Sequence, residues 1–339
     1  MAGALSIALG AVKKAALTLG GTANAKAQDL YLQADALRKS ADSAEAFQKM
    51  IALYDAALAI DPNYGDAHLG KANSLTVSAG QYATSPAQLA EMLGRAEVSV
   101  KRAASLMPAS GRPAAMFAEI SGNRLDFVAS LRGFEQALAA EPNDGFVMRK
   151  ALNNFPWLGD GMQALALANR YIALDPLNPT AYAERGICLY VLRRYGDAID
   201  AFNKELAIAP QRNTPRYYIA QSMILLNRSS DARAVLAKMP PDDWSRQTNE
   251  AILAGRSGDR AGPETLIAKM RGAFGDPASY QYGQIYTQLG DAARAFAAFD
   301  KAVEARDPGM FQFKRDPFLD PIRRDPRYAA LLTRLKFPA

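Results

Sequence analysis

Residues 179–210 read PTAYAERGICLYVLRRYGDAIDAFNKELAIAP and decide the fold. Apolar and small residues recur there at steps of three and four, the spacing of one side of a helix: Tyr182, Gly186, Leu189 and Tyr190. After a break at residues 193–197, a second such stripe follows: Ala198, Ile199, Phe202 and Leu206. Gly196 is the expected turn residue of the break. Because Gly186 and Ala198 are small, two antiparallel helices can approach closely, and the stretch predicts a helical hairpin.

The hairpin recurs along the chain. Units of this kind close on prolines whose successive spacings are 46, 34, 34 and 34 residues: Pro62, Pro108, Pro142, Pro176 and Pro210. A period of 34 is that of the tetratricopeptide repeat (TPR). The chain resembles TPR proteins over most of its length, with unit endings such as Asp61-Pro62 and Leu174-Asp175-Pro176. The resemblance implies an all-α, right-handed superhelix (an α-solenoid) of about eight helical hairpins.

Three parts are expected along the chain. Residues 1–26 form a leading amphipathic helix and a linker, and residues 27–305 form the TPR array. Residues 306–339 form a turn region rich in Asp-Pro pairs and a capping helix that covers the last repeat. The unit that ends at Pro108 is longer than the period, and residues 78–85 are expected to hold the excess as a loop.

The Asp-Pro pairs of the last part are each expected to start a turn or a short helix. Asp accepts a hydrogen bond from an exposed helix N–H, and Pro at the next position loses no bond there. The four aspartates are Asp307, Asp316, Asp320 and Asp325. An apolar stripe on the final helix follows them: Tyr328, Leu331, Leu332 and Leu335.

A narrower resemblance rests on the C-terminal runs Leu289-Gly290-Asp291, Phe313-Lys314-Arg315-Asp316-Pro317 and Asp325-Pro326-Arg327-Tyr328. These are similar to the end of a bacterial group in which a TPR array follows an adenylate/guanylate cyclase domain or a winged-helix DNA-binding domain, often with a TolB-like segment. The resemblance implies a regulatory or oligomerising region of a signalling protein. No cyclase metal-binding strand pair and no winged helix is visible in the sequence, so no enzymatic or DNA-binding residue is carried over.

The composition is typical of a folded, soluble protein, with 49% hydrophobic and 22% charged residues. The net charge is +6, and residues 309–339 hold seven Lys/Arg against three Asp. No long basic run exists, so nucleic acid is not an expected partner. The apolar run of residues 2–12 precedes Lys13-Lys14, the reverse of a signal peptide, and is too short to span a bilayer. A cytoplasmic location is expected, with a secreted or periplasmic one as the alternative.

The candidate catalytic and metal-binding residues have simpler interpretations. Residues 65–72, GDAHLGKA, nearly spell a phosphate-binding loop, but Ala72 replaces the required hydroxyl residue and the stretch falls on a predicted helix. His68 is the only histidine and Cys188 the only cysteine, which excludes the usual zinc site and leaves no support for a Ser-His-Asp triad. Cys188 is expected to be a small buried apolar residue. We predict no catalytic residue, no metal and no cofactor.

The predicted binding site is the concave groove, which the first helix of each repeat lines in TPR arrays. The outward positions of these helices give the candidate groove residues: Arg149, Asn153, Trp157, Ile187, Tyr190, Tyr217 and Gln221. Aromatic rings and arginine are typical of binding hot spots. The alternative is that the rings only pack between repeats. Arg149 and Asn153 resemble the first part of a carboxylate clamp, but Glu184 and Thr214 replace its later residues.

The sequence therefore predicts a non-enzymatic scaffold that captures a peptide, a protein or another segment of its own chain in the groove. Homo-oligomerisation stays open. Two alternatives are a regulatory region of a bacterial signalling protein and a reader of single-stranded RNA. The confinement of the basic excess to the tail argues against the RNA reader.

Overall fold

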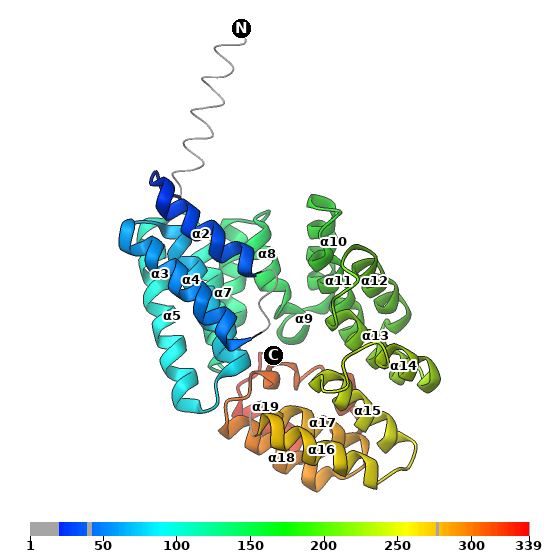
Figure 1. The fold of residues 1–339 in the computed structure, drawn as a ribbon. Helices are drawn as coiled ribbons and strands as arrows, with labels where there is room; N and C mark the ends of the chain where they lie inside the picture. The colour runs from blue at the N-terminus through cyan, green and yellow to red at the C-terminus, as the bar shows by residue number, and fades with distance from the viewer. Residues whose placement is uncertain (1–19, 39–42, 276–277, 339) are drawn as a thin grey trace. The chain divides into compact units, whose positions relative to one another are not determined.

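The structure is a computed structural model that describes residues 20–38, 43–275 and 278–338. These residues are helical and contain no strand, which confirms the predicted fold class. They form two compact units (Figure 1). The first unit takes the chain up to Ile120 together with Gly133–Glu141, and the second takes Ser121–Arg132 together with residues 142 onwards. Of the leading helix and linker predicted for residues 1–26, residues 1–19 lie outside the described residues.

The first unit is built from paired helices. Their bounds are α2 (Ala25–Arg38), α3 (Ala44–Ile60), α4 (Gly65–Tyr82), α5 (Pro86–Leu106), most of α6 (Arg112–Asn123) and the second half of α7 (Phe127–Ala140). Tyr31 packs between Tyr54 and Tyr64, with ring centroids 5.7 and 5.2 Å away. The loop predicted for residues 78–85 is wrong. The helix α4 continues to Tyr82, because Ser78 and Ala79 are buried and packing holds them in the helix.

The second unit continues with helix pairs. Their bounds are α8 (Gly145–Leu152), α9 (Phe155–Leu158), α10 (Gly161–Leu174), α11 (Pro179–Val191), α12 (Tyr195–Ile208), α13 (Thr214–Leu225), α14 (Ser229–Leu236), α15 (Trp244–Arg256), α16 (Ala261–Phe274), α17 (Ser279–Gln288) and α18 (Ala292–Glu304). Two 3₁₀-helices, η2 (Pro308–Gln312) and η3 (Pro317–Ile322), and the helix α19 (Pro326–Arg334) complete it. Each helix pair is formed by residues that are close in the sequence, as the repeat pattern predicts.

The close approach within a hairpin occurs where the sequence predicts it. A Cβ atom added to Gly186 of α11 would lie 2.5 Å from the ring of Phe202 in α12. Gly283 of α17 faces Phe299 of α18 in the same way, at 2.3 Å. Only a residue without a side chain fits such a contact, since real Cβ atoms do not approach a ring this closely.

The turn between α11 and α12 differs from the prediction. Gly196 is the second residue of α12, and Arg193 is the residue with a left-handed backbone, at φ 64°. The N–H groups of Arg193 and Arg194 donate to the carbonyl oxygens of Tyr190 and Leu189, which satisfies the end of α11. Hydrogen bonding at the helix end therefore fixes the turn residue, although arginine is less suited to this conformation than glycine.

The Asp-Pro pairs act as predicted at three of four positions. Asp307, Asp316 and Asp325 cap η2, η3 and α19, each accepting a backbone hydrogen bond two residues ahead. Asp320 starts no element, because it lies inside η3 and Pro321 continues that helix. The predicted stripe on α19 is buried at Tyr328 and Leu331.

Candidate functional site on the inner face of the second unit

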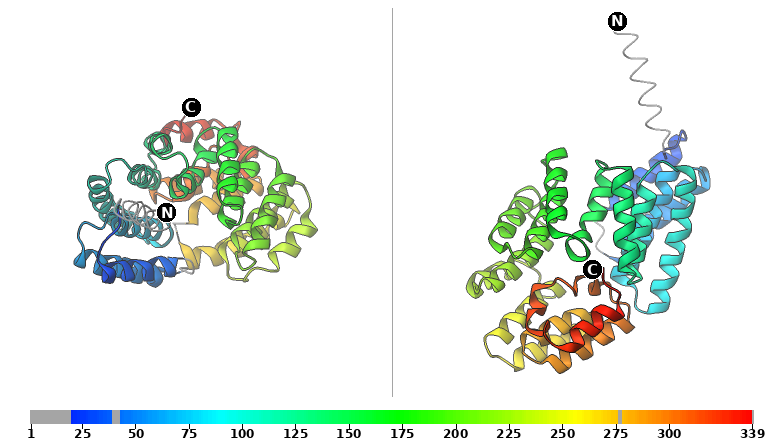
Figure 2. Two further views of the ribbon diagram at one scale, coloured as in Figure 1. Left: turned by 90° about the horizontal axis from the view of Figure 1, so that it is seen from above. Right: turned by 180° about the vertical axis from the view of Figure 1, so that it is seen from behind.

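The most informative surface is the one on which the chain places its own C-terminal segment, defined here as residues 307–322. In the second unit the helices α8 to α18 follow an arc, and the C-terminal segment runs along its inner side (Figure 2). The 3₁₀-helix η2 contacts both α9 and α18, and η3 contacts α17. The segment therefore connects the first and the last repeats of this unit.

Asp316 is the buried polar centre of this contact. Its carboxylate accepts hydrogen bonds from the Tyr280 hydroxyl at 2.7 Å, from Gln284 Nε2 at 2.5 Å and from the Phe318 backbone N–H at 2.9 Å. Burial raises the pKa of Asp316, and these hydrogen bonds oppose the shift. An aspartate removed from water requires such partners, so the helix α17 is built to receive this residue.

Aromatic side chains surround the same position. The aromatic cluster consists of Trp157, Tyr190, Tyr217 and Tyr218. Trp157 meets Phe311 of the C-terminal segment edge to face, with ring centroids 5.9 Å apart, and lies 6.2 Å from Tyr190. Burial and then the charge of Asp316 raise the pKa of Tyr190 well above its usual value. The cluster therefore contacts the chain's own segment as well as neighbouring repeats.

The two ends of the C-terminal segment are also fixed. Gln288 Nε2 donates to the Phe318 carbonyl oxygen at 2.5 Å, and Arg193 pairs with Asp320 at 2.8 Å. Phe313 is buried and stacks on Tyr328 of α19, with ring centroids 4.7 Å apart. Backbone, charge and apolar contacts thus hold a segment that consists mainly of the 3₁₀-helices η2 and η3.

The structure leaves none of the seven predicted groove residues fully exposed. Arg149, Asn153 and Ile187 are half-buried. The other four are buried, with 2, 1, 8 and 2% of their surface exposed: Trp157, Tyr190, Tyr217 and Gln221. Contact of these residues with a separate partner stays a prediction.

Glu184 and Thr214 are the two positions that depart from the carboxylate-clamp pattern. Glu184 is buried, and its Oε2 atom has no hydrogen-bond partner among the described residues. Burial raises the pKa of Glu184 to about 8, while the charge of Arg149 opposes the shift. Thr214 is the first residue of α13. Neither Glu184 nor Thr214 can supply a cation that would join Arg149 in binding a partner's carboxylate.

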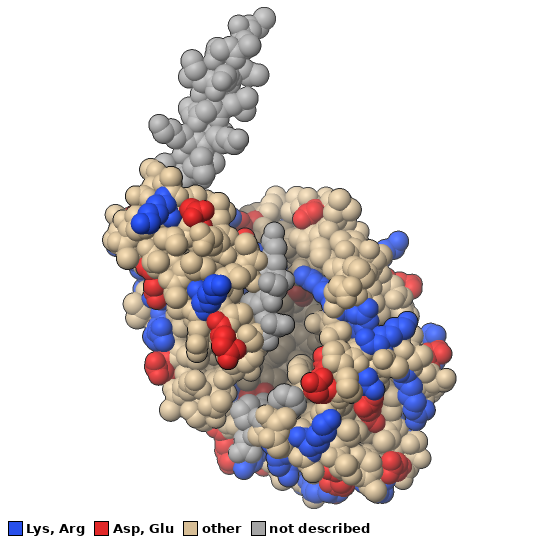
Figure 3. All heavy atoms as spheres, in the orientation of Figure 1, with Lys and Arg blue, Asp and Glu red and all other residues tan. Residues whose placement is uncertain are grey.

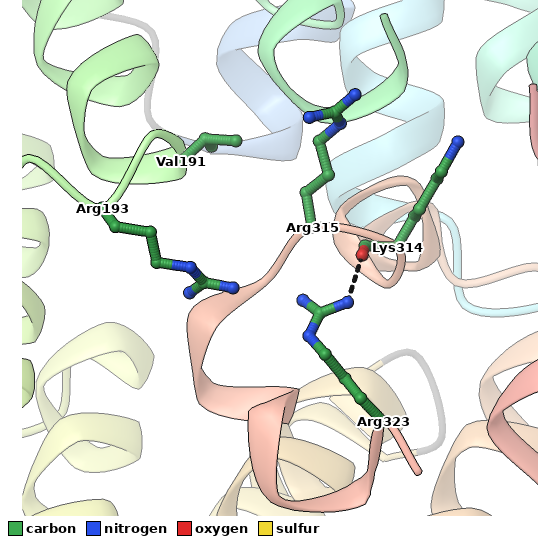
Figure 4. A pocket seen from close by; sticks show the side chains of 5 residues that line it. All are labelled: Val191, Arg193, Lys314, Arg315 and Arg323. Atoms are coloured by element: carbon green, nitrogen blue, oxygen red, sulfur yellow. Dashed lines mark hydrogen bonds between the residues drawn. The ribbon is translucent and has the colours of Figure 1, made fainter. Parts of the chain in front are cut away.

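A basic pocket lies at the edge of the C-terminal segment. Figure 4 shows its lining side chains: Val191, Arg193, Lys314, Arg315 and Arg323. The pocket occupies about 460 Å³. The sequence prediction missed these four cations as a site. The excess of Lys and Arg in residues 309–339 is the signal that could have pointed to them, but only folding brings Arg193 to the same place.

The residues that the sequence analysis considered and set aside as catalytic or metal-binding candidates have structural roles. His68 Nε2 lies 3.0 Å from the Pro62 carbonyl oxygen, and Tyr182 and Arg216 contact the carbonyls of Pro176 and Pro210 with the same six-residue spacing. Cys188 is buried, as predicted. Residues 65–72, which resemble a phosphate-binding loop, lie within α4. Across the described ranges, no three His, Cys, Asp or Glu side chains gather as metal ligands.

On the face drawn in Figure 3, acidic and basic side chains alternate over the second unit. None of the helices in the described part of the chain combines the length and apolar character needed to cross a bilayer.

The comparison with protein families supplies the deciding observation. The family model of the tetratricopeptide repeat matches residues 158–213, which contain the stretch quoted first. The chain contains tetratricopeptide repeats. No curated protein sequence matches it.

Solved structures share the fold of this chain. The human IFIT1 dimer with m7Gppp-AAAA is 16% identical, with a TM-score of 0.57, over 82% of this chain and 71% of that one. A tetratricopeptide repeat protein from Parabacteroides merdae is 12% identical, with a TM-score of 0.52, over 80% of this chain and 100% of that one. At such identities the likeness shows the fold alone.

Proposed function

We propose that this protein is a non-catalytic scaffold that binds a polypeptide segment on the inner face of its second unit. The partner segment has the chemistry of the C-terminal segment, with an aromatic residue followed a few positions later by an aspartate. The protein's own segment occupies the face until such a partner competes with it.

The observation that supports this proposal is the docked C-terminal segment itself. Trp157 receives an aromatic ring, Tyr280 and Gln284 receive a carboxylate, and Gln288 receives a backbone carbonyl. Each of these contacts recognises a group that another polypeptide can also provide. Aromatic anchors in a desolvated pocket are the usual hot spots of such binding.

The test uses a fluorescent peptide with the sequence of residues 305–324 and the full-length protein. The intramolecular segment competes at a high effective concentration, so the unaltered protein should bind the peptide weakly. Phe311→Ala in the protein loosens its own segment and should strengthen peptide binding by about tenfold or more. Arg324→Ala alters an exposed residue of the same tail and should leave the binding unchanged. If neither the protein nor its Phe311→Ala variant binds the peptide, the proposal is wrong.

The alternative proposal is a regulatory role in a bacterial signalling protein. It rests on the resemblance of residues 289–328 and does not depend on whether the protein is cytoplasmic. It requires that the array pairs with itself or with another domain. Sedimentation of the full chain at several concentrations tests self-association. Binding of m7Gppp-AAAA belongs to human IFIT1, and an equivalent RNA is not proposed as the ligand of this groove.

A further inference from the structure

The basic pocket has more cationic groups than its surroundings neutralise. Arg193 and Arg323 share one carboxylate, that of Asp320, at 2.8 and 2.6 Å. Neither Lys314 nor Arg315 has an ion pair within the described residues. The carboxylate of Asp316 also interacts with Arg323, so four cations face two carboxylates and leave an excess of two positive charges.

The four cations differ in how far the fold uses them. Arg323 donates to the carbonyl oxygens of Lys314 and Asp316 and to the Tyr328 hydroxyl, so it is a structural part of the pocket. Lys314 Nζ donates to the Pro338 carbonyl oxygen. Arg315 makes no side-chain hydrogen bond in the described part of the chain, and its Nε atom is buried without a partner. A buried donor with no acceptor is costly, and a bound anion would satisfy it.

Arg193 is the one pocket cation that lies outside the C-terminal tail, in a helix-end turn whose backbone conformation Leu125 and Asn227 share. This residue follows the end of α11 in a left-handed conformation, at φ 64°. Gly290, which follows α17 in the same way, is at φ 74°. Glycine adopts this conformation freely, whereas arginine pays about 1 kcal/mol. In Figure 4 Arg193 and Arg323 extend toward each other, whereas the side chains of Arg315 and Lys314 extend toward the top of the view.

From this geometry we propose that the basic pocket binds a phosphate-bearing anion of at least two negative charges, on its own as a phosphoanhydride or at the end of a nucleotide. Guanidinium groups bind phosphate oxygens in pairs of hydrogen bonds, and two positive charges in excess match a doubly charged anion better than a single carboxylate. A volume of about 460 Å³ suits a small molecule. This site adjoins the polypeptide contacts at Trp157 and Asp316, because Lys314 and Arg315 belong to the C-terminal segment itself.

Isothermal titration calorimetry of the full chain with inorganic tripolyphosphate at 150 mM salt tests the proposal. Saturable one-to-one binding is expected. Arg315→Ala should weaken it by at least about tenfold, because charged hydrogen bonds are lost. Arg193→Gly should also weaken tripolyphosphate binding. Glycine adopts the left-handed backbone conformation of this position without strain, so the substitution should not destabilise the turn. Arg324→Ala removes one exposed arginine from the same tail and should change the affinity by less than about twofold.

Further titrations separate the sources of the phosphate. ATP that binds more tightly than tripolyphosphate would identify a nucleotide site, and equal affinities would identify a site for the phosphate chain alone. An equal loss in Arg324→Ala and Arg315→Ala would overturn the proposal, since the effect would then be general attraction. An absence of saturable tripolyphosphate binding would also overturn the proposal. This holds even if a 5′-triphosphorylated oligonucleotide binds, since the pocket is proposed to bind the phosphate chain itself. Far-ultraviolet circular dichroism and urea midpoints confirm that the variants are folded.

Discussion

The hydroxyl of Tyr280 donates a 2.7 Å hydrogen bond to the buried carboxylate of Asp316, 36 residues further along the chain. This bond ties a helix of the last TPR hairpin to a segment that has left the repeat pattern. Gln284 Nε2 and the Phe318 N–H complete the coordination of the same carboxylate. The segment is therefore held from inside the protein rather than merely resting on its surface.

Replacing Asp316 tests how much this coordination contributes. Asp316→Ala leaves three buried donors without an acceptor and should lower the free energy of unfolding by about 3 kcal/mol. Asp316→Asn keeps an acceptor oxygen and should cost about 1 kcal/mol. Urea denaturation followed by circular dichroism measures both values. Equal costs for the two variants would show that the hydrogen bonds contribute little.

The stability of the protein should fall as the pH rises from 5 to 8. Burial raises the pKa of Glu184 to about 8 and that of Asp307 to about 7. Both pKa values are raised above those of the unfolded chain, so the folded protein binds more protons. The contribution is complete below the unfolded pKa of about 4 and is lost as the pH passes through these values. Urea denaturation at pH 5, 6.5 and 8 measures the trend.

Glu184→Gln separates this residue from the other buried carboxyl groups. The variant has no charge to bury, so it should be more stable than the unaltered protein by about 1 kcal/mol or more at pH 8. At pH 5 the two should agree within about 0.5 kcal/mol. A pH dependence that Glu184→Gln leaves unchanged would show that Glu184 does not titrate in this range.

The contact between Trp157 and Phe311 should be visible in fluorescence. The sequence has two tryptophans; Trp157 is buried, whereas Trp244 is 44% exposed. In a Trp244→Phe background, Phe311→Ala should shift the emission of Trp157 to longer wavelength and raise hydrogen exchange in residues 308–322. Leu177→Ala, at a residue that is 78% exposed, is the control and should change neither signal. An unshifted emission would mean that Phe311 does not shield Trp157 from water.

The two glycines of the central hairpin should respond in opposite directions. Gly186→Ala would place a methyl group 2.5 Å from the ring of Phe202 and should cost about 2 kcal/mol or more. Gly196→Ala, in the first turn of α12 with open space around it, should stabilise the protein by about 0.5 kcal/mol. Thermal unfolding of the two variants measures the difference. If Gly186→Ala is neutral, the helices do not need this close approach.

Some features were determined by the sequence alone. The 34-residue spacing of the prolines, the small residue at Gly186 and the Asp-Pro caps are local signals, because a helical hairpin is formed by residues close in the chain. These signals predicted the helices, the close approach of two helices at Gly186 and a turn or short helix after Asp307 and Asp316, whereas the contact with Phe202 and the 3₁₀ type are findings of the structure. The resemblance to cyclase-linked arrays stays a prediction.

Other features required the tertiary structure. Burial of Ser78 and Ala79 extends α4 through a predicted loop, and hydrogen bonds at the end of α11 make Arg193 the turn residue. The docking of residues 307–322 buries Trp157 and Tyr190 and brings Arg193 beside Arg315. These contacts join positions more than 100 residues apart, and no periodic pattern encodes them. Whether two such positions meet depends on the number of repeats between them and on the curvature of the arc. The packing of each hairpin on the next sets that curvature.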